Sequence, residues 1–115
     1  MTMRDDRTRL LHIRDHVAEA VALAEGKTRS ELETDRLLNL SLVRLLEIVG
    51  QSAARVSEET QRQYPQIPWQ DIAGLRDRLL HGYDTVDLDI LWNIVHDDLP
   101  PLVERIQKAA TGGIV

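Results

Sequence analysis

Hydrophobic residues recur along the chain at spacings of three and four, the period that puts side chains on one face of an α-helix. No segment shows sustained alternation of apolar and polar positions, so no strand is predicted. The first stripe predicts a helix from about Asp6 to Glu25, with Gly26 as its stop signal. Its apolar positions are Leu10, Ile13, Val17, Val21 and Ala24.

A second stripe predicts a long helix in the middle of the chain. Ser30 and Glu33 fit a capping box that opens a short helical turn. Either Thr34 or Asp35 can then cap the long helix. The apolar positions of this helix are Leu38, Leu42, Leu45, Val49, Ala53 and Val56.

Small residues near the end of this second stripe indicate that a neighbouring helix approaches closely. They are Gly50 and the pair Ala53-Ala54. Ser57 is followed by two glutamates, so it can cap a further helical turn, and that turn must end before Pro65.

The segment from Tyr64 to Pro68 is predicted to be a loop, and Pro68 or Trp69 is placed to begin a third helix. We expect that helix to run to about His81, with Gly82 ending it. Its buried face consists of Ile72, Leu75 and Leu79.

The last helix is predicted to begin after Asp87, a good capping residue, and to be kinked or briefly broken at Pro100-Pro101. Its stripe keeps one phase across the prolines, and the chain from Thr111 onward is expected to fray. The stripe consists of Leu88, Leu91, Val95, Leu99, Leu102 and Ile106.

Together these patterns predict an all-α fold, an up-and-down bundle of four main helices plus short helical turns. Its 115 residues are enough for one domain, 1–115, with a core at about 6–109 and a tail at 110–115. Phenylalanine is absent, so the core must be aliphatic. The aromatic residues are Tyr64, Trp69, Tyr83 and Trp92.

Composition narrows the possible functions. The chain has no cysteine, which excludes disulfides and thiolate metal sites. Its start does not resemble a secretory signal, and no apolar run approaches the about 20 residues of a membrane span. We therefore expect a soluble, cytoplasmic protein.

The net charge of −5 disfavours nucleic-acid binding unless a local basic patch exists. Arg76 and Arg78 could seed such a patch, and a two-fold dimer would double it.

The segment from Pro68 to Tyr83 gathers the side chains best suited to chemistry. Arg76 can hold a phosphate with its planar fork of donors. His81 can exchange a proton near neutral pH. The pair suits RNA transesterification, in which a 2′-hydroxyl attacks the adjacent phosphate. The nucleophile belongs to the substrate, so no metal or cofactor is required.

Spacing alone is weak support for this interpretation. An arginine and a histidine separated by four to six residues occur three times in the chain, and a single match of this kind has little meaning without context. The ordinary alternatives are a surface cation and a histidine that interacts with the dipole of its helix C-terminus. The three pairs are Arg7 with His12, Arg9 with His16, and Arg76 with His81.

A longer pattern supplies that context, because residues 67–102 closely resemble the HepT-like branch of the HEPN superfamily. A looser similarity extends the resemblance to about residues 8–107, through a helix ending in Gly26, Leu46-Glu-Ile-Val-Gly-Gln-Ser-Ala53 and Tyr64-Pro65. Each short motif is weak, but the combination is specific. The motifs are Ile67-Pro-Trp69, Ile72-Ala-Gly-Leu-Arg-Asp77, Leu80-His-Gly-Tyr83, Val86-Asp-Leu88 and Asp98-Leu-Pro100.

The resemblance implies a HEPN-like homodimer in which the Arg–x4–His motif of each subunit faces a shared cleft. It implies a metal-independent endoribonuclease that acts as the toxin of a pair with a minimal nucleotidyltransferase antitoxin. Arg76 would bind the scissile phosphate and His81 would act as general base or acid. Asp77 would orient one of them. Asparagine is more usual at that position, and the aspartate charge would favour a protonated imidazole or weaken phosphate binding.

Two further residues take roles from this resemblance and its chemistry. Tyr83 matches the tyrosine to which the antitoxin attaches AMP, which would block the RNA phosphate at Arg76 and His81. Without the family context, Tyr83 could equally be a packing residue with its hydroxyl at the surface. Arg78 is a candidate RNA-binding residue.

Two other functions stay open. The chain could be a non-catalytic helical adaptor or nucleotide-binding subunit of a nucleotidyltransferase complex, which the net charge and Asp77 favour slightly. It could also be a dimerisation module without a ligand.

Several other side chains could carry a site. His12 and His16 have a metal-binding spacing but no evident third ligand. His96-Asp-Asp98 fits a helix break better than a cation site. We expect Trp69 and Trp92 to be core anchors and not base-stacking platforms. The acidic pair at 5–6 is expected to interact with the dipole of the first helix.

Overall fold

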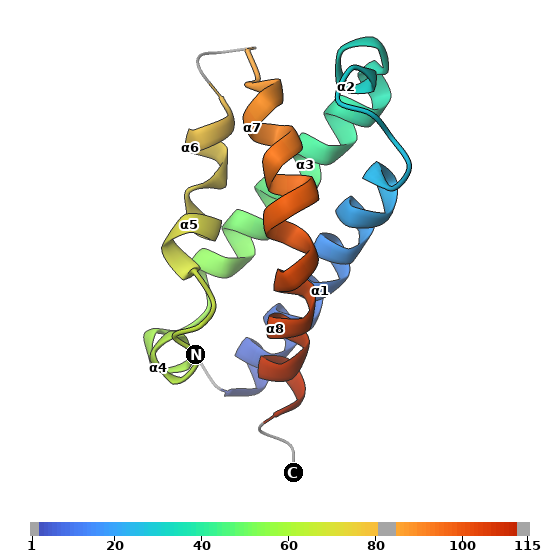
Figure 1. The fold of residues 1–115 in the computed structure, drawn as a ribbon. Helices are drawn as coiled ribbons and strands as arrows, with labels where there is room; N and C mark the ends of the chain where they lie inside the picture. Colours follow the sequence, from blue (N-terminus) through green and yellow to red (C-terminus); the bar gives the residue numbers. More distant parts are fainter. Residues whose placement is uncertain (1–2, 81–84, 113–115) are drawn as a thin grey trace.

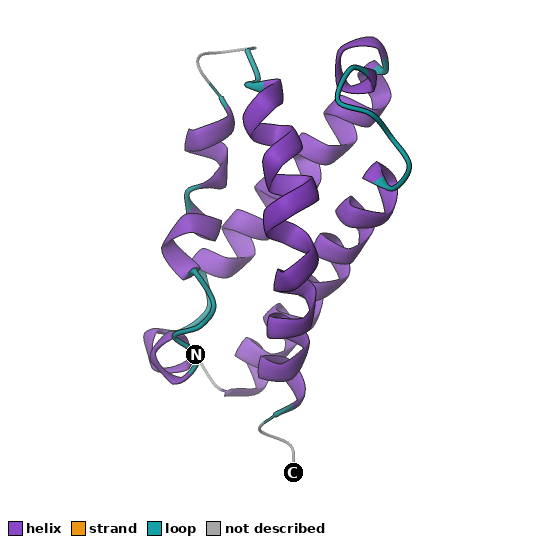
Figure 2. Cartoon of the chain, in the orientation of Figure 1, coloured by secondary structure: helices purple, strands orange, loops and turns teal. Residues whose placement is uncertain are grey.

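The computed structural model describes residues 3–80 and 85–112 (Figure 1). All regular structure in these ranges is helical (Figure 2), apart from one antiparallel bridge between Leu80 and Val86. The predicted all-α class is therefore confirmed. The elements are α1 (Met3–Ala24), α2 (Glu31–Thr34), α3 (Arg36–Ala54), α4 (Glu58–Gln63), α5 (Trp69–Ala73), α6 (Leu75–Leu79), α7 (Leu88–Asn93), the π-helical turn η1 (Ile94–Asp98) and α8 (Leu99–Thr111).

The long helical rods of the fold are α1, α3, the pair α5 and α6, and α7 followed through η1 by α8, and they run alongside one another in Figure 1. Helix α1 packs against α3 and α8, while α3 also contacts α5 and α6. Helix α6 in turn contacts α7. These rods correspond to the four main helices that the apolar stripes predict.

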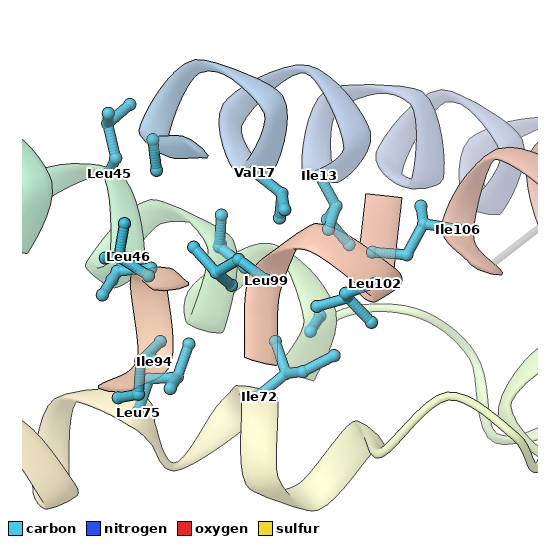
Figure 3. Packing of buried hydrophobic residues seen from close by; sticks show 14 of the residues in the cluster. Ile13, Val17, Leu45, Leu46, Ile72, Leu75, Ile94, Leu99, Leu102 and Ile106 are labelled. Carbon is cyan, nitrogen blue, oxygen red and sulfur yellow. The ribbon is translucent and has the colours of Figure 1, made fainter. Parts of the chain in front are cut away.

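An aliphatic core joins the rods, as the composition predicts. Figure 3 shows Ile13 and Val17 of α1 pointing toward the last rod, where Leu99 lies. Ile72 and Leu75 reach the same rod from α5 and α6. All five side chains are at most 4% exposed, so the apolar stripes of distant segments meet in one core.

Helix α1 begins three residues before the predicted start and ends where the sequence indicates. Gly26 adopts a φ of +75°, a left-handed conformation that favours glycine and stops the helix. Ala20 is fully buried, whereas Val21, which belongs to the predicted stripe, is only half-buried.

Three predicted helix caps are confirmed, because in each case a side-chain oxygen accepts the backbone N–H three residues further on. Each bond satisfies a donor that the first turn of its helix leaves without a partner. The pairs are Asp35 with Leu38 at 3.0 Å, Ser57 with Thr60 at 3.3 Å, and Asp87 with Ile90 at 3.0 Å.

The predicted capping box at Ser30 is wrong. Ser30 has helical backbone angles, and its side chain accepts no capping hydrogen bond. The backbone N–H of Thr28 instead donates to the Glu31 carboxylate at 3.1 Å. This bond from a backbone N–H to the carboxylate three residues further on is the one expected in a capping box, but it starts at Thr28 and not at Ser30. The chain already turns at Thr28, whose carbonyl accepts the Glu31 N–H.

The predicted third helix is two short helices, which is a second correction. Gly74, with φ −91° and ψ 7°, separates α5 from α6. Helix α6 ends at Leu79, before the expected end at His81, because Leu80 is extended and pairs with Val86. His81 and Gly82 lie outside the described residues.

The predicted break near Pro100-Pro101 is confirmed and takes the form of a π-helical turn. Prolines bring no N–H donor and crowd the preceding turn of a helix. The turn before them is widened, so the N–H of Leu99 donates to the carbonyl of Ile94 five residues back. Leu91, Val95 and Leu99 all stay buried, so the stripe continues across the break.

Helix α3 is long and apolar enough, by length and composition alone, to cross a membrane, with a mean hydropathy of 1.2. The lack of a long uninterrupted apolar run predicts that no helix could span a membrane, and α3 differs from that expectation. In the bundle, 44% of the 18-residue stretch with this hydropathy is buried, and the helix contacts α1, α5 and α6. Its apolar face thus serves as core, as in the central helix of a helical bundle.

A buried carboxylate ties α4 to the start of α1. Asp6, only 2% exposed, accepts the backbone N–H of Ser57 at 3.0 Å and the hydroxyl of Thr60 at 2.6 Å, and the Ser57 hydroxyl also donates to it. Burial alone would raise the pKa of Asp6, but these hydrogen bonds and the charge of Arg9 outweigh it and lower that pKa below 3.8. Asp5 and Asp6 do lie in the first turn of α1, as expected.

We expect Asp6→Ala to lower the free energy of unfolding by about 1–3 kcal/mol at pH 7, because it leaves partly buried donors unpaired. The folded-state pKa is lowered, so this stabilisation is present above pH 3.8 and is lost as the pH falls through the folded value. Urea unfolding of wild type and Asp6→Ala at pH 7 measures the loss of stability, and the same experiment near pH 3 measures how much of the difference disappears in acid. Asp5→Ala is the control on the same turn, and an equal loss for both variants would contradict the role given to Asp6.

Candidate active site

Arg76 lies on the first turn of α6, with 64% of its side chain exposed. Its Nε is 4.0 Å from Oε2 of Glu47 on α3, whose side chain is only 23% exposed. Glu47 is the one ionic partner of Arg76 within residues 3–80 and 85–112. An ion pair this exposed contributes little to stability, so the guanidinium can bind an anion at small energetic cost.

A groove of about 210 Å³ separates α3 from α5 and α6 at this point. Arg76 and Asp77, which are neighbours in the sequence, both line it. Small side chains on both helices leave room for the groove. Its lining is Leu46, Glu47, Gly50, Gln51 and Ala54 from α3, with Ala73, Arg76 and Asp77 from α5 and α6.

Gly50 sets how closely α3 approaches α5. A Cβ at this position would lie 3.0 Å from the carbonyl oxygen of Ile72 and 3.5 Å from that of Ala73. Real Cβ atoms rarely come that close to backbone oxygen, so glycine is needed for this helix spacing. The close approach predicted from the small residues is therefore confirmed.

Arg78 lies in a different cleft, of about 490 Å³, between α5–α6 and η1–α8. Arg105 also lines this cleft, but so do Asp71, Asp97 and Asp98. Residues two apart on a helix point in nearly opposite directions, which is why Arg76 and Arg78 separate. Within one subunit they do not form the joint basic patch expected from the sequence.

His81 and Tyr83, the other two predicted site residues, lie outside the described residues. On either side of them, Leu80 pairs with Val86, and the N–H of Asp87 donates to the carbonyl of Leu79 at 2.8 Å.

Two of the other histidines, His16 and His96, have local partners. Nδ1 of His16 lies 2.7 Å from the carbonyl oxygen of His12. The ring of His96 stacks on Trp92, with centroids 3.6 Å apart and an interplanar angle of 27°. Across the part of the chain that the structure describes, no three histidine, aspartate or glutamate side chains are grouped closely enough to hold a metal ion.

The two tryptophans pack as the sequence predicts. Trp69 is buried, and its indole N–H donates to the carbonyls of Gln61 at 3.1 Å and Tyr64 at 3.0 Å. Trp92 is half-buried against the core. Both are core anchors, which confirms the prediction.

Comparison with known proteins finds related sequences over most of the chain. The family model described as Ribonuclease HepT-like matches residues 13–109. A protein of Thermococcus cleftensis named probable ribonuclease HepT is 34% identical over 98 residues, covering 82% of this chain and 89% of the relative. A candidate RNase of Methanocaldococcus jannaschii is 29% identical over 108 residues, covering 94% of this chain and 89% of the relative. No solved structure gives a significant match.

The helical bundle and these matches place the molecule among small all-α ribonucleases. The chain belongs to the Ribonuclease HepT-like family, a branch of the HEPN superfamily. Its matched range, 13–109, covers Arg76, Asp77 and the segment that carries His81.

Sequence reasoning did not assign a role to Glu47. The residue belongs to the motif Leu46-Glu-Ile-Val-Gly-Gln-Ser-Ala53, which carried part of the resemblance. The signal in the sequence is a carboxylate between the apolar residues Leu46 and Ile48, where a specific partner is expected. Only the fold shows that the partner is Arg76.

We expect Gly50→Val to lower the free energy of unfolding by about 1–3 kcal/mol, because the new side chain would press on the backbone at Ile72. Urea denaturation measures this loss. Gln51→Val, at the exposed neighbouring position of α3, controls for the helix propensity of valine. Equal stability of the two variants would show that close packing at Gly50 is unimportant.

Proposed function

We propose that this protein is a metal-independent endoribonuclease in which Arg76 binds the scissile phosphate and His81 transfers protons. The observation that carries the proposal is the exposed guanidinium of Arg76, held at the edge of a groove in a HepT-like fold. The names of the relatives support ribonuclease activity. The residue roles rest on the chemistry of the Arg–x4–His pattern.

In the proposed reaction the 2′-oxygen of one nucleotide forms a bond to the adjacent phosphorus, and the bond from phosphorus to the 5′-oxygen breaks. A base removes the proton of the 2′-hydroxyl, and an acid protonates the departing 5′-oxygen. His81 takes one of these roles, and Arg76 stabilises the charge that builds up on the phosphate. Asp77, which lines the same groove as Arg76, orients one of these two side chains.

The active form we propose is a cytoplasmic homodimer in which the motifs of both subunits face one cleft. One chain carries a net charge of −5, and its groove holds one arginine against two carboxylates, Glu47 and Asp77. A second Arg76 in the same cleft would place two guanidinium groups around one phosphate, together with the second chain's own Glu47 and Asp77. Arg78 then contributes to RNA binding from its separate cleft.

We further propose that the protein is the toxin of a toxin–antitoxin pair and that a minimal nucleotidyltransferase neutralises it. The phenol oxygen of Tyr83 attacks the α-phosphorus of ATP, pyrophosphate leaves, and AMP stays on the tyrosine. The added phosphate and nucleoside would exclude RNA from the nearby groove. The short chain distance from Arg76 to Tyr83 supports this inhibition.

Purified protein should cleave RNA in the presence of a chelator, and Arg76→Ala should lower the rate at least about a hundredfold, because it removes the main electrostatic stabiliser. Gel analysis of a defined RNA measures this loss. His81→Ala should behave similarly. Arg78→Ala is the matched control on the same short helix, and we expect it to weaken RNA binding without abolishing cleavage.

Equal losses for Arg76→Ala and Arg78→Ala would contradict the assignment of the phosphate to Arg76. A folded wild-type protein that binds nucleotides but cleaves no RNA would instead favour the non-catalytic adaptor of a nucleotidyltransferase complex. The net charge of −5 is the observation that keeps this second function in consideration.

Coexpression with a minimal nucleotidyltransferase from the neighbouring gene should add whole AMP units to the protein, because the phenol of Tyr83 is the proposed acceptor. Intact-mass and peptide mass spectrometry measure the addition and its position. Tyr83→Phe should remove the modification, whereas Tyr64→Phe, at the other tyrosine of the chain, should leave it unchanged. AMP found elsewhere would overturn the assignment.

A further inference from the structure

Glu47 faces Arg76 across the groove, from a part of α3 that cannot easily move. Its neighbour Leu46 is completely buried, and Gly50, one turn further on, is held against the backbone at Ile72. The carboxylate therefore projects from a part of α3 that is packed on both sides of it along the helix. Arg76, by contrast, belongs to a helix of only five residues.

The side of the guanidinium that meets Glu47 is informative. The ion pair joins Oε2 of Glu47 to Nε of Arg76, the guanidinium nitrogen closest to the backbone, and the two atoms are 4.0 Å apart. An arginine restrained through Nε can still present its two terminal nitrogens as a fork to a phosphate. The carboxylate and the phosphate would then occupy different edges of one planar group.

Such a contact has two opposite effects on RNA cleavage. The negative charge of Glu47 repels the phosphate and so weakens substrate binding. Restraining the long side chain of Arg76 before RNA arrives reduces the entropy lost at the transition state. An exposed pair at this distance adds little to folding stability, so a change in kcat without a change in stability would identify a role in the reaction.

We propose that Glu47 is a positioning residue, which holds the guanidinium of Arg76 so that its terminal nitrogens face the scissile phosphate. This inference rests on the proposed function of Arg76. It predicts that the charge of Glu47 supports turnover although it opposes substrate binding. The first effect appears in kcat and the second in KM.

The test uses the full-length protein and a defined RNA in chelator. Glu47→Gln keeps the side-chain shape and removes the charge, so kcat should fall roughly tenfold or more, while KM stays the same or decreases. Glu47→Asp, which restores the charge on a shorter arm, should recover part of kcat. Glu104→Gln, at an exposed position of α8, is the matched control and should behave as wild type.

A second arm distinguishes positioning from a structural role. Lysine is a point charge without a planar fork, so Glu47→Gln should change kcat little when Arg76 is already replaced by lysine. The urea midpoint of Glu47→Gln should equal that of Glu104→Gln. An unchanged kcat in Glu47→Gln, a full additive loss with Arg76→Lys, or a kcat loss that merely follows stability would overturn the inference.

Arg76→Ala, measured alongside, separates the two possible failures. If wild type cleaves RNA and Arg76→Ala does not, but Glu47→Gln matches wild type, then only the role of Glu47 is wrong. If Arg76→Ala cleaves as well as wild type, or wild type does not cleave at all, the proposed function fails and this inference fails with it.

Discussion

The close contact between α3 and α5 at Gly50 sets the spacing of the groove that Arg76 lines. A Cβ there would stand 3.0 Å from the carbonyl oxygen of Ile72, so the two helices reach this spacing only because the side chain is absent. Glu47 and Arg76 project from the two sides of this contact, and their charged groups come within 4.0 Å. The shape of the groove and the pairing of its arginine both follow from that one packing constraint.

Electrostatics make this an unusual place to bind RNA, because the groove of one subunit holds two carboxylates and one arginine. General attraction between a basic surface and the phosphate backbone cannot provide the affinity in a chain with a net charge of −5. The proposed activity instead depends on local geometry. It needs an oriented guanidinium at the phosphate, and a second subunit would bring its own Glu47 and Asp77 together with its Arg76, so the ratio of carboxylates to arginines would stay the same.

Much of the fold could be predicted from the sequence, because apolar periodicity and capping residues act over a few positions. The small residue Gly50 even indicated which part of α3 is approached closely. The parts that were missed depend on contacts between distant segments. The hydrogen bonds from Ser57 to Asp6 join residues 51 positions apart, and the partner of Glu47 lies on another rod. Gly74 separates two helices in a way that the apolar pattern does not show.

The most direct test of the central claim is the cleavage of one RNA with and without a single 2′-deoxy substitution at the cleaved linkage, in chelator. A reaction that uses the 2′-oxygen of the substrate should leave a 2′,3′-cyclic phosphate and a 5′-hydroxyl, and the 2′-deoxy linkage should stay intact. Cleavage of the 2′-deoxy linkage at an equal rate, or cleavage that appears only when divalent metal is added, would contradict the account.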